Sequence, residues 1–237
     1  MLSVATARSF TKTKELLKAL RLEIPMVLLD GAMVATVDNK VIATHTLDQE
    51  TGDAVIEMGT AYGIDPFVIG LKEDGVNESF LYPRRLNEHQ KAVLKDYKDD
   101  PRLQFNPKNR SMPKNLKIVY FGEKEQLEPF AKNLHETFSS QIEIKLSPEK
   151  YGGGYFLTLL HPKGDKAHAL EDVAAYLGKD ITDFTVFGDS LNDVKMFQKA
   201  GTSVAVANAL DEVKAAADIV LEHSNDEDAV AKYLKSQ

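Results

Sequence analysis

Apolar positions follow two different rhythms along the chain. At both ends, short apolar runs of strand length alternate with segments whose apolar residues recur at helical spacing. In the C-terminal part this order predicts strands over 184–188, 203–208 and 218–221, and helices over 166–178, 192–201, 209–217 and 227–236. Strand, helix and strand in regular order are typical of right-handed parallel crossovers in an α/β sheet.

The N-terminal part predicts two strands and two helices. The apolar run from Leu2 to Ala5 predicts a buried strand, and Ser9 or Thr11 can cap a helix over 11–22. A second strand is expected over 25–37, turned at Asp30-Gly31, and a helix over 49–63. In the first helix the leucines at 16, 17 and 20 recur at helical spacing.

The middle of the chain has a different character. Strand-like runs occur at 66–73, 78–83, 115–122, 141–148 and 155–162, with a helix over 123–138 and loop-forming residues over 96–114. This pattern favours an α+β domain with a mostly antiparallel sheet. We therefore expect residues 1–40 and 159–237 to form one α/β core with a parallel sheet, and 41–158 an inserted domain.

Composition excludes several classes of protein. The chain has 237 residues and no cysteine, so it has no disulfide framework and no thiolate zinc site. A formal net charge of -7 argues against a general nucleic-acid binder. No apolar run approaches the roughly 20 residues that span a bilayer, and the first residues lack the features of a signal peptide. A cytoplasmic location fits this composition.

Candidate chemistry gathers where ligands bind in parallel α/β sheets, at the carboxyl ends of the strands. Six residues stand at such positions: Thr6, Arg8, Lys166, Asp189, Asn192 and Asp193. Carboxylate oxygens suit Mg²⁺, and a lysine with a hydroxyl can hold phosphate oxygens. Each residue also has a purely structural interpretation, because the Gly-Asp-Ser turn can simply cap a helix and Lys166 can be a solvated lysine. The order and placement of the set favour a phosphate and magnesium site.

These residues also carry a family resemblance. "FGDSLNDVKMF", followed by "AGTSVAVANALDEVKAAADIVL", closely resembles the fourth motif and C-terminal core of haloacid dehalogenase (HAD) superfamily phosphatases, subfamily IIB (Cof-type). "HPKGDKAHAL" is similar to the third motif, with Lys166 as its lysine, and "VATARS" to the second, with Ala7 in place of the usual glycine. The inserted domain has the position and size of the family's cap, so the resemblance covers essentially the whole chain.

The resemblance implies a Rossmann-like core with a cap, and a Mg²⁺-dependent phosphatase of small phosphorylated metabolites such as sugar phosphates. It places Thr6 and Lys166 in the catalytic phosphate clamp, with Arg8 and Asn192 as further phosphate contacts. It makes Asp189 a metal ligand and Asp193 a second or water-mediated one. In the family an aspartate of an Asp-x-Asp motif attacks the phosphoryl group.

That first motif, Asp-x-Asp-Gly-Thr, is expected some tens of residues before "VATARS" and is not found there. The nearest imitation, "VLLDGAM", offers Asp30-Gly31 but has Leu28 at the nucleophile position. A late gene start, a truncation or a remodelled form would each give this sequence. We expect the 237-residue chain to hydrolyse phosphate esters at background rate. The rival function is a non-catalytic protein that keeps the phosphate and Mg²⁺ pocket, or only the fold, for binding or assembly.

In the family the strand of the first motif lies between the segments 2–5 and 184–188. Without it, the two segments can pair directly, another segment can fill the slot, or a second copy of the chain can cover it. We expect a filled or covered slot, because direct closure requires the helices on both faces to repack.

Overall fold

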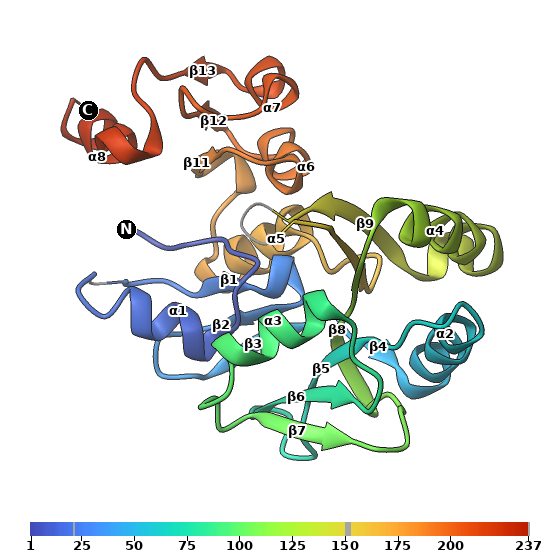
Figure 1. The fold of residues 1–237 in the computed structure, drawn as a ribbon. Helices are drawn as coiled ribbons and strands as arrows, with labels where there is room; N and C mark the ends of the chain where they lie inside the picture. Colours follow the sequence, from blue (N-terminus) through green and yellow to red (C-terminus); the bar gives the residue numbers. More distant parts are fainter. Residues whose placement is uncertain (21, 150–152, 237) are drawn as a thin grey trace. The chain divides into compact units, whose positions relative to one another are not determined.

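The computed structural model describes residues 1–20, 22–149 and 153–236 (Figure 1). The chain divides into two compact units, one formed by Met1–Ala43 with Asp165–Gln237 and the other by Thr44–Gly164. The boundaries expected from the sequence, after residues 40 and 158, fall a few residues before these. Within the described residues, no helix is both long enough and apolar enough to cross a membrane.

The N-terminal part of the first unit contains a short helix and a small sheet. The helix α1 (Phe10–Leu16) is followed by β1 (Met26–Leu28), the 3₁₀ turn η1 (Leu29–Gly31), β2 (Met33–Ala35) and β3 (Val41–Thr44). The sheet has the order β1-β2-β3, and β1 pairs with β2 in antiparallel register. The two strands are joined by the turn expected at Asp30-Gly31, where Asp30 has φ 64° and Gly31 φ 115°.

The strand expected over Leu2–Ala5 is not a regular strand. Ala5 forms a single parallel bridge with Val27, and backbone hydrogen bonds run from Thr6 N to Val27 O (2.9 Å) and from Val27 N to Val4 O (2.9 Å). Leu2 is exposed, so the expected burial is wrong at that end. The segment gains its partners from β1 on one side.

The C-terminal part of the first unit has the expected parallel arrangement. It comprises α5 (Lys166–Leu177), η3 (Ile181–Asp183), β11 (Thr185–Gly188), η4 (Leu191–Asp193), α6 (Val194–Phe197), β12 (Thr202–Ala205), α7 (Asp211–Ala216), β13 (Ile219–Val220), η5 (Asn225–Glu227) and α8 (Ala229–Lys235). The sheet order is β11-β12-β13, and both strand pairs are parallel.

The expectation that both terminal parts share one parallel sheet is wrong for the described residues. They form two separate three-stranded sheets, and β11 stands at the edge of its own. No backbone hydrogen bond of the described chain joins 2–5 to 184–188, so direct closure has not occurred. The two parts are joined by side-chain packing, because Ala5 and Phe184 each contact two apolar clusters of this unit.

The second unit is built on a single large sheet. It comprises β4 (Leu47–Asp48), α2 (Gln49–Ala61), β5 (Phe67–Leu71), β6 (Glu78–Pro83), α3 (Glu88–Asp96), β7 (Leu103–Asn106), β8 (Lys114–Gly122), α4 (Lys124–Phe138), η2 (Ser139–Gln141), β9 (Glu143–Pro148) and β10 (Tyr155–Leu160). The order is β7-β6-β5-β8-β10-β9, with β4 paired to β8. Within this sheet, β6 and β7 form the one parallel pair among the described residues, and the other pairs are antiparallel. The strand β7 lies in the stretch 96–114, which the sequence predicts to be loops.

Alternation along β8 divides the core of the second unit between two faces. Ile118 and Tyr120 belong to a cluster with Val55 of α2 and Leu127 of α4. Val119 and Phe121 point to the opposite face, where Val93 and Leu94 of α3 pack. This unit therefore has apolar cores of its own. Since both units combine helices with sheets, the mixed α/β class expected from the sequence is confirmed.

Candidate functional site

The turn after β11 is organised by one buried carboxylate. Oδ2 of Asp193 accepts hydrogen bonds from the backbone N–H groups of Asp189 and Ser190, both at 3.1 Å. Gly188 makes this close approach feasible, because a Cβ at that position would lie 2.6 Å from Cβ of Asp193. The side chain of Asp193 thus fixes the backbone conformation of the Gly-Asp-Ser turn.

Lys166 contacts the same carboxylate from the first residue of α5. Its Nζ donates to Oδ1 of Asp193 at 2.6 Å, and the two side chains are only 8% and 3% exposed. Removing either partner of such a buried pair is costly, because it leaves an uncompensated charge in the interior. The pair fixes the start of α5 against the turn that carries Asp189 and Asn192.

Asp30 is a buried acid that the sequence interpretation dismissed as an imitation of a motif. It is 5% exposed, and its Oδ1 accepts a hydrogen bond from Nδ2 of Asn192 at 2.9 Å. The amide Oδ1 of Asn192 is buried and has no hydrogen-bond partner among the described residues. In the sequence, Asp30 is marked only by the Asp-Gly pair that it forms with Gly31 between two apolar runs.

Thr6 and Arg8, from the segment "VATARS", are bonded through their backbone carbonyls to the turn that contains Asp30. The N–H of Asp30 donates to the carbonyl of Thr6 at 3.0 Å, and the N–H of Leu29 donates to the carbonyl of Arg8 at 3.0 Å. The Thr6 hydroxyl oxygen accepts from the N–H of Arg8 at 3.1 Å. Arg8 is exposed, and no ion pair joins its guanidinium to another described residue. Thr6 and Asn192 are thus linked through Asp30.

Asp165 is a second buried acid that the sequence did not single out. It caps α5 by accepting from the N–H of His168 at 2.9 Å, and its other oxygen lies 3.3 Å from Nζ of Lys195. Burial acts to raise the pKa of Asp165, but the hydrogen bonds from His168 and the charge of Lys195 outweigh burial and lower it. Its carbonyl packs on Gly31, where a Cβ would lie 2.1 Å from that oxygen.

The donors that could hold a metal here are all oxygens. Asp189 is half-buried, and the orphaned Oδ1 of Asn192 is an uncommitted acceptor, so the two fit the oxygen preference of Mg²⁺. Both oxygens of Asp193 are already engaged by Lys166 and the backbone. No group of three acidic or histidine side chains in the described residues could hold a metal ion. A magnesium ion would therefore depend on water and substrate oxygens for most of its ligands.

A comparison of sequences places the chain among known hydrolases. A family model described as haloacid dehalogenase-like hydrolase matches residues 1–234. A 5-amino-6-(5-phospho-D-ribitylamino)uracil phosphatase of Bacillus subtilis is 24% identical over 99% of this chain and 85% of its own length. A phosphoglycolate phosphatase of Halobacterium salinarum is 48% identical over 25% of this chain and 27% of its own length.

Solved structures of low sequence identity share the fold. A protein from Thermotoga maritima matches with a TM-score of 0.77 at 22% identity, covering 99% of this chain and 84% of its own. A structure titled as a HAD subclass IIB sugar phosphatase matches with a TM-score of 0.74 at 22% identity over the same shares. From the match over residues 1–234, the chain belongs to the haloacid dehalogenase-like hydrolase family, whose curated relatives found here bear phosphatase names.

Proposed function

We propose that the protein binds small phosphorylated metabolites, such as sugar phosphates, at the group formed by Thr6, Lys166 and the turn after β11. The observation that carries the proposal is the buried contact of Lys166 with Asp193 at 2.6 Å, which holds an ammonium group beside the Asp189 turn. An ammonium has three donors, and Asp193 takes one of them. The phosphatase names of the relatives support a phosphate ester as ligand.

The individual side chains take distinct roles in this proposal. Lys166 and the Thr6 hydroxyl contact the phosphate oxygens, and Arg8 supplies a further positive charge. Asp189 and the amide oxygen of Asn192 would hold Mg²⁺, which would supply positive charge against the phosphate. Asp193 acts through Lys166 and the backbone of the turn, which makes it a positioning residue unless the metal displaces one of its partners. A cytoplasmic location goes with a substrate of this class.

Hydrolysis by this 237-residue sequence is a separate matter from binding. The sequence contains no Asp-x-Asp-Gly-Thr, and Leu28 precedes Asp30 where a nucleophile is required. We infer that the 237-residue chain binds phosphate and Mg²⁺ with turnover at background level. The second candidate function is a non-catalytic phosphate-binding or assembly protein on the same fold.

The unpaired edge of β11 supports a further part of this proposal. Among the described residues β11 pairs with β12 alone, and an open edge accepts another strand readily. A strand from another segment or from a second copy of the chain would cover it. Sedimentation velocity at several concentrations tests the second copy, since a strictly monomeric chain across the micromolar range would remove it.

The test measures turnover and binding together. Purified chain is assayed with an aryl phosphate and with a sugar phosphate in the presence and absence of Mg²⁺, and phosphate binding is followed by titration calorimetry. We expect Mg²⁺-enhanced binding that Asp189→Asn weakens, with turnover within a few-fold of the blank. The exposed acid Glu212 gives the charge-matched control, because Glu212→Gln changes the same charge outside the site. Mg²⁺-dependent turnover that Asp189→Asn abolishes would show a nucleophile that we have not recognised.

A further inference from the structure

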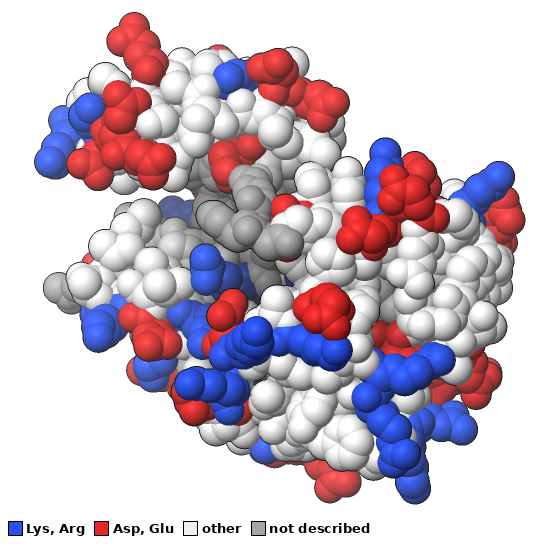
Figure 2. Space-filling view, viewed as in Figure 1, with Lys and Arg blue, Asp and Glu red and all other residues white. Residues whose placement is uncertain are grey.

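A pocket of about 450 Å³ lies in the second unit, beside α2. Its volume is in the range of small-molecule sites. It is lined from four segments: α2, Asp65 in the loop before β5, the stretch that follows β6, and residues 107–110 that follow β7. Figure 2 shows Lys and Arg side chains gathered with acidic ones over the part of this unit where Figure 1 draws α2. Nothing in the proposed core site accounts for this pocket.

One wall of the pocket contains Asp65, whose negative charge is neutralised by Arg85. Asp65 accepts two hydrogen bonds from Arg85, at 2.7 and 2.9 Å, and one from Nδ2 of Asn109 at 2.8 Å. Burial acts to raise the pKa of Asp65, but the hydrogen bonds from Arg85, Thr60 and Asn109 lower it below its ordinary value. The bidentate geometry means that Asp65 and Arg85 neutralise each other.

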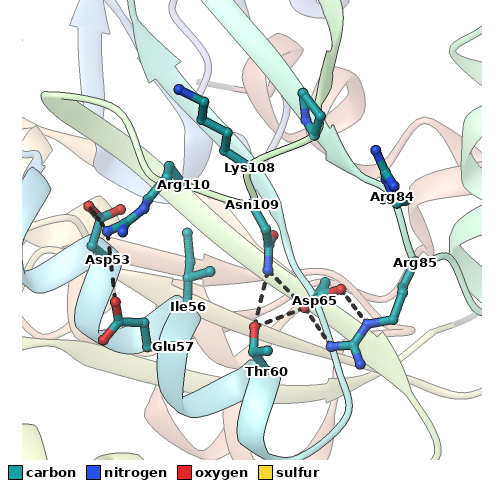
Figure 3. Close-up of a pocket in the computed structure, with 11 residues that line it drawn as sticks. Asp53, Ile56, Glu57, Thr60, Asp65, Arg84, Arg85, Lys108, Asn109 and Arg110 are labelled. Atoms are coloured by element: carbon teal, nitrogen blue, oxygen red, sulfur yellow. Dashed lines mark hydrogen bonds and ion pairs between the residues drawn. The ribbon is translucent and has the colours of Figure 1, made fainter.

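The opposite wall carries one arginine and two acids, so one negative charge remains in excess there. Arg110 lies 3.0 Å from Oδ2 of Asp53 and 3.7 Å from Oε1 of Glu57. Two lining cations remain, Arg84 and Lys108, and neither forms an ion pair with any described residue. Figure 3 shows these two side chains on either side of Asn109, both pointing away from the Asp65 cluster. The pocket therefore offers two cations that no protein acid has neutralised.

Asn109 adds a polar group whose bonding is incomplete. It has a left-handed backbone (φ 48°), and its Nδ2 donates to Asp65 and to Thr60 Oγ1. Its Oδ1 is buried and has no hydrogen-bond partner among the described residues. An unsatisfied buried acceptor is costly, and a hydrogen-bond donor on a ligand would satisfy it. Ile56 and Pro107 provide apolar surface in the same pocket.

We propose that this pocket, formed by residues of the second unit alone, is an anion-binding site for a phosphorylated polyhydroxy metabolite. Arg84 and Lys108 contact different oxygens of the phosphate, and a ligand hydroxyl donates to Oδ1 of Asn109. A phosphate suits two separated cations better than a carboxylate, because it presents oxygens in several directions, whereas a carboxylate fits one planar arginine. The ligand's carbon atoms lie against Ile56 and Pro107.

The test follows individual backbone amides in the full chain. Proton–nitrogen correlation spectra are recorded without Mg²⁺ during titration with glycerol 2-phosphate at constant ionic strength. We expect saturable shifts at residues 107–110 that are fitted separately from any shifts at 189–193 of the core. Arg84→Ala and Lys108→Ala should each weaken binding at 107–110 by about tenfold or more, since each removes a charge-assisted contact.

Matched controls make the result decisive. Lys98→Ala removes one positive charge from an exposed position of the same unit that does not line the pocket, and should leave the affinity within twofold. Acetate serves as the carboxylate arm and should bind at least tenfold more weakly than the phosphate. Equal weakening by Lys98→Ala, non-saturable shifts, or the same shifts with sodium chloride alone would overturn the proposal. Because 107–110 and 189–193 are read separately, failure of the core site leaves this test intact.

Discussion

At the scale of single residues, the centre of the candidate site is the buried pair of Lys166 and Asp193. Replacing Lys166 by methionine keeps the length of the side chain but leaves Asp193 charged without its cation. We expect Lys166→Met to lower the free energy of unfolding by about 3–5 kcal/mol, measured by urea denaturation. In the double variant Lys166→Met/Asp193→Asn part of this loss should be recovered, because the amide still accepts from the turn.

The exposed pair of Lys91 and Glu88 provides the comparison, with Nζ 2.6 Å from Oε1 and both side chains more than half exposed. Lys91→Met should cost about 0.5 kcal/mol or less, since solvent screens surface pairs. If the two lysine variants are equally stable, the core pair is not buried as described.

Gly31 supports the site through its backbone. It combines φ 115° with a position where a Cβ would lie 2.1 Å from the carbonyl oxygen of Asp165. We expect Gly31→Ala to destabilise the chain by at least about 3 kcal/mol in thermal and urea unfolding. Gly178 is the control, because it also has positive φ (+62°) but faces open space, so Gly178→Ala should cost only about 1–2 kcal/mol. Similar losses at both positions would mean that the close approach to Asp165 is absent.

Sequence reasoning found most residues of this cluster but missed two acids. Residue type and spacing identify four members of the cluster: Lys166, Asp189, Asn192 and Asp193. Asp30 and Asp165 have the same chemistry, yet their partners, Asn192 and Lys195, lie far away in the sequence. The first contact joins η1 to η4 and the second joins the start of α5 to α6, so only the tertiary fold makes them and a local pattern cannot report them.

At the scale of elements, α5 is well specified by its own ends. The expected range 166–178 and the observed Lys166–Leu177 agree, because Asp165 caps the start and Gly178 adopts the left-handed conformation at the end. The helix expected over 11–22 lacks such signals and ends at Leu16, and the side chain of Ser9 makes no capping hydrogen bond. The helical spacing of its leucines predicted a longer helix, but such spacing does not show that an apolar surface exists for them to pack on.

The same contrast gives a prediction for leucine truncations. Leu16 is 60% exposed, whereas Leu127 of α4 is fully buried in the second unit. We expect Leu127→Ala to cost about 2–5 kcal/mol, because it leaves a cavity, and Leu16→Ala to cost about 0.5 kcal/mol or less. Chemical denaturation of both variants measures the difference. A large loss at Leu16 would indicate that another surface, such as a second copy, covers α1.

The cap of α5 predicts a dependence of stability on pH. The pKa of Asp165 is lower in the folded chain than its ordinary value of about 3.9, so the unfolded chain binds more protons between the two values. The stabilisation by Asp165 is therefore complete above about pH 4 and is lost as the pH falls through the folded pKa. Asp165→Asn should flatten the loss of stability between pH 5 and 3, while the exposed Asp99→Asn should leave it unchanged. Parallel curves for wild type and Asp165→Asn would contradict this assignment.

At the scale of the whole molecule, the two units differ in how the chain builds them. The first unit joins two distant segments, and Ala5 packs on clusters formed by the C-terminal one. The second unit is one continuous segment, Thr44–Gly164, with its own sheet and two apolar faces. The sequence indicated this division through the change of rhythm between its middle and its ends. It could not indicate the division of the first unit into two sheets, because strand pairing is a long-range property.

This construction predicts independent folding of the second unit. The excised segment 44–164 should unfold cooperatively by circular dichroism, because β4 pairs with β8 inside the segment and both faces of the sheet are covered from within. Leu127→Ala should lower its stability by the same amount, within about 0.5 kcal/mol, as it does in the full chain, since distant sites contribute additively. The segment 1–43 is the opposite case, because its apolar side chains pack on residues of α5 that the excision removes, and it should remain unfolded alone. If 44–164 unfolds without a cooperative transition, the two units stabilise each other and the stability effects predicted for each unit would not be separable.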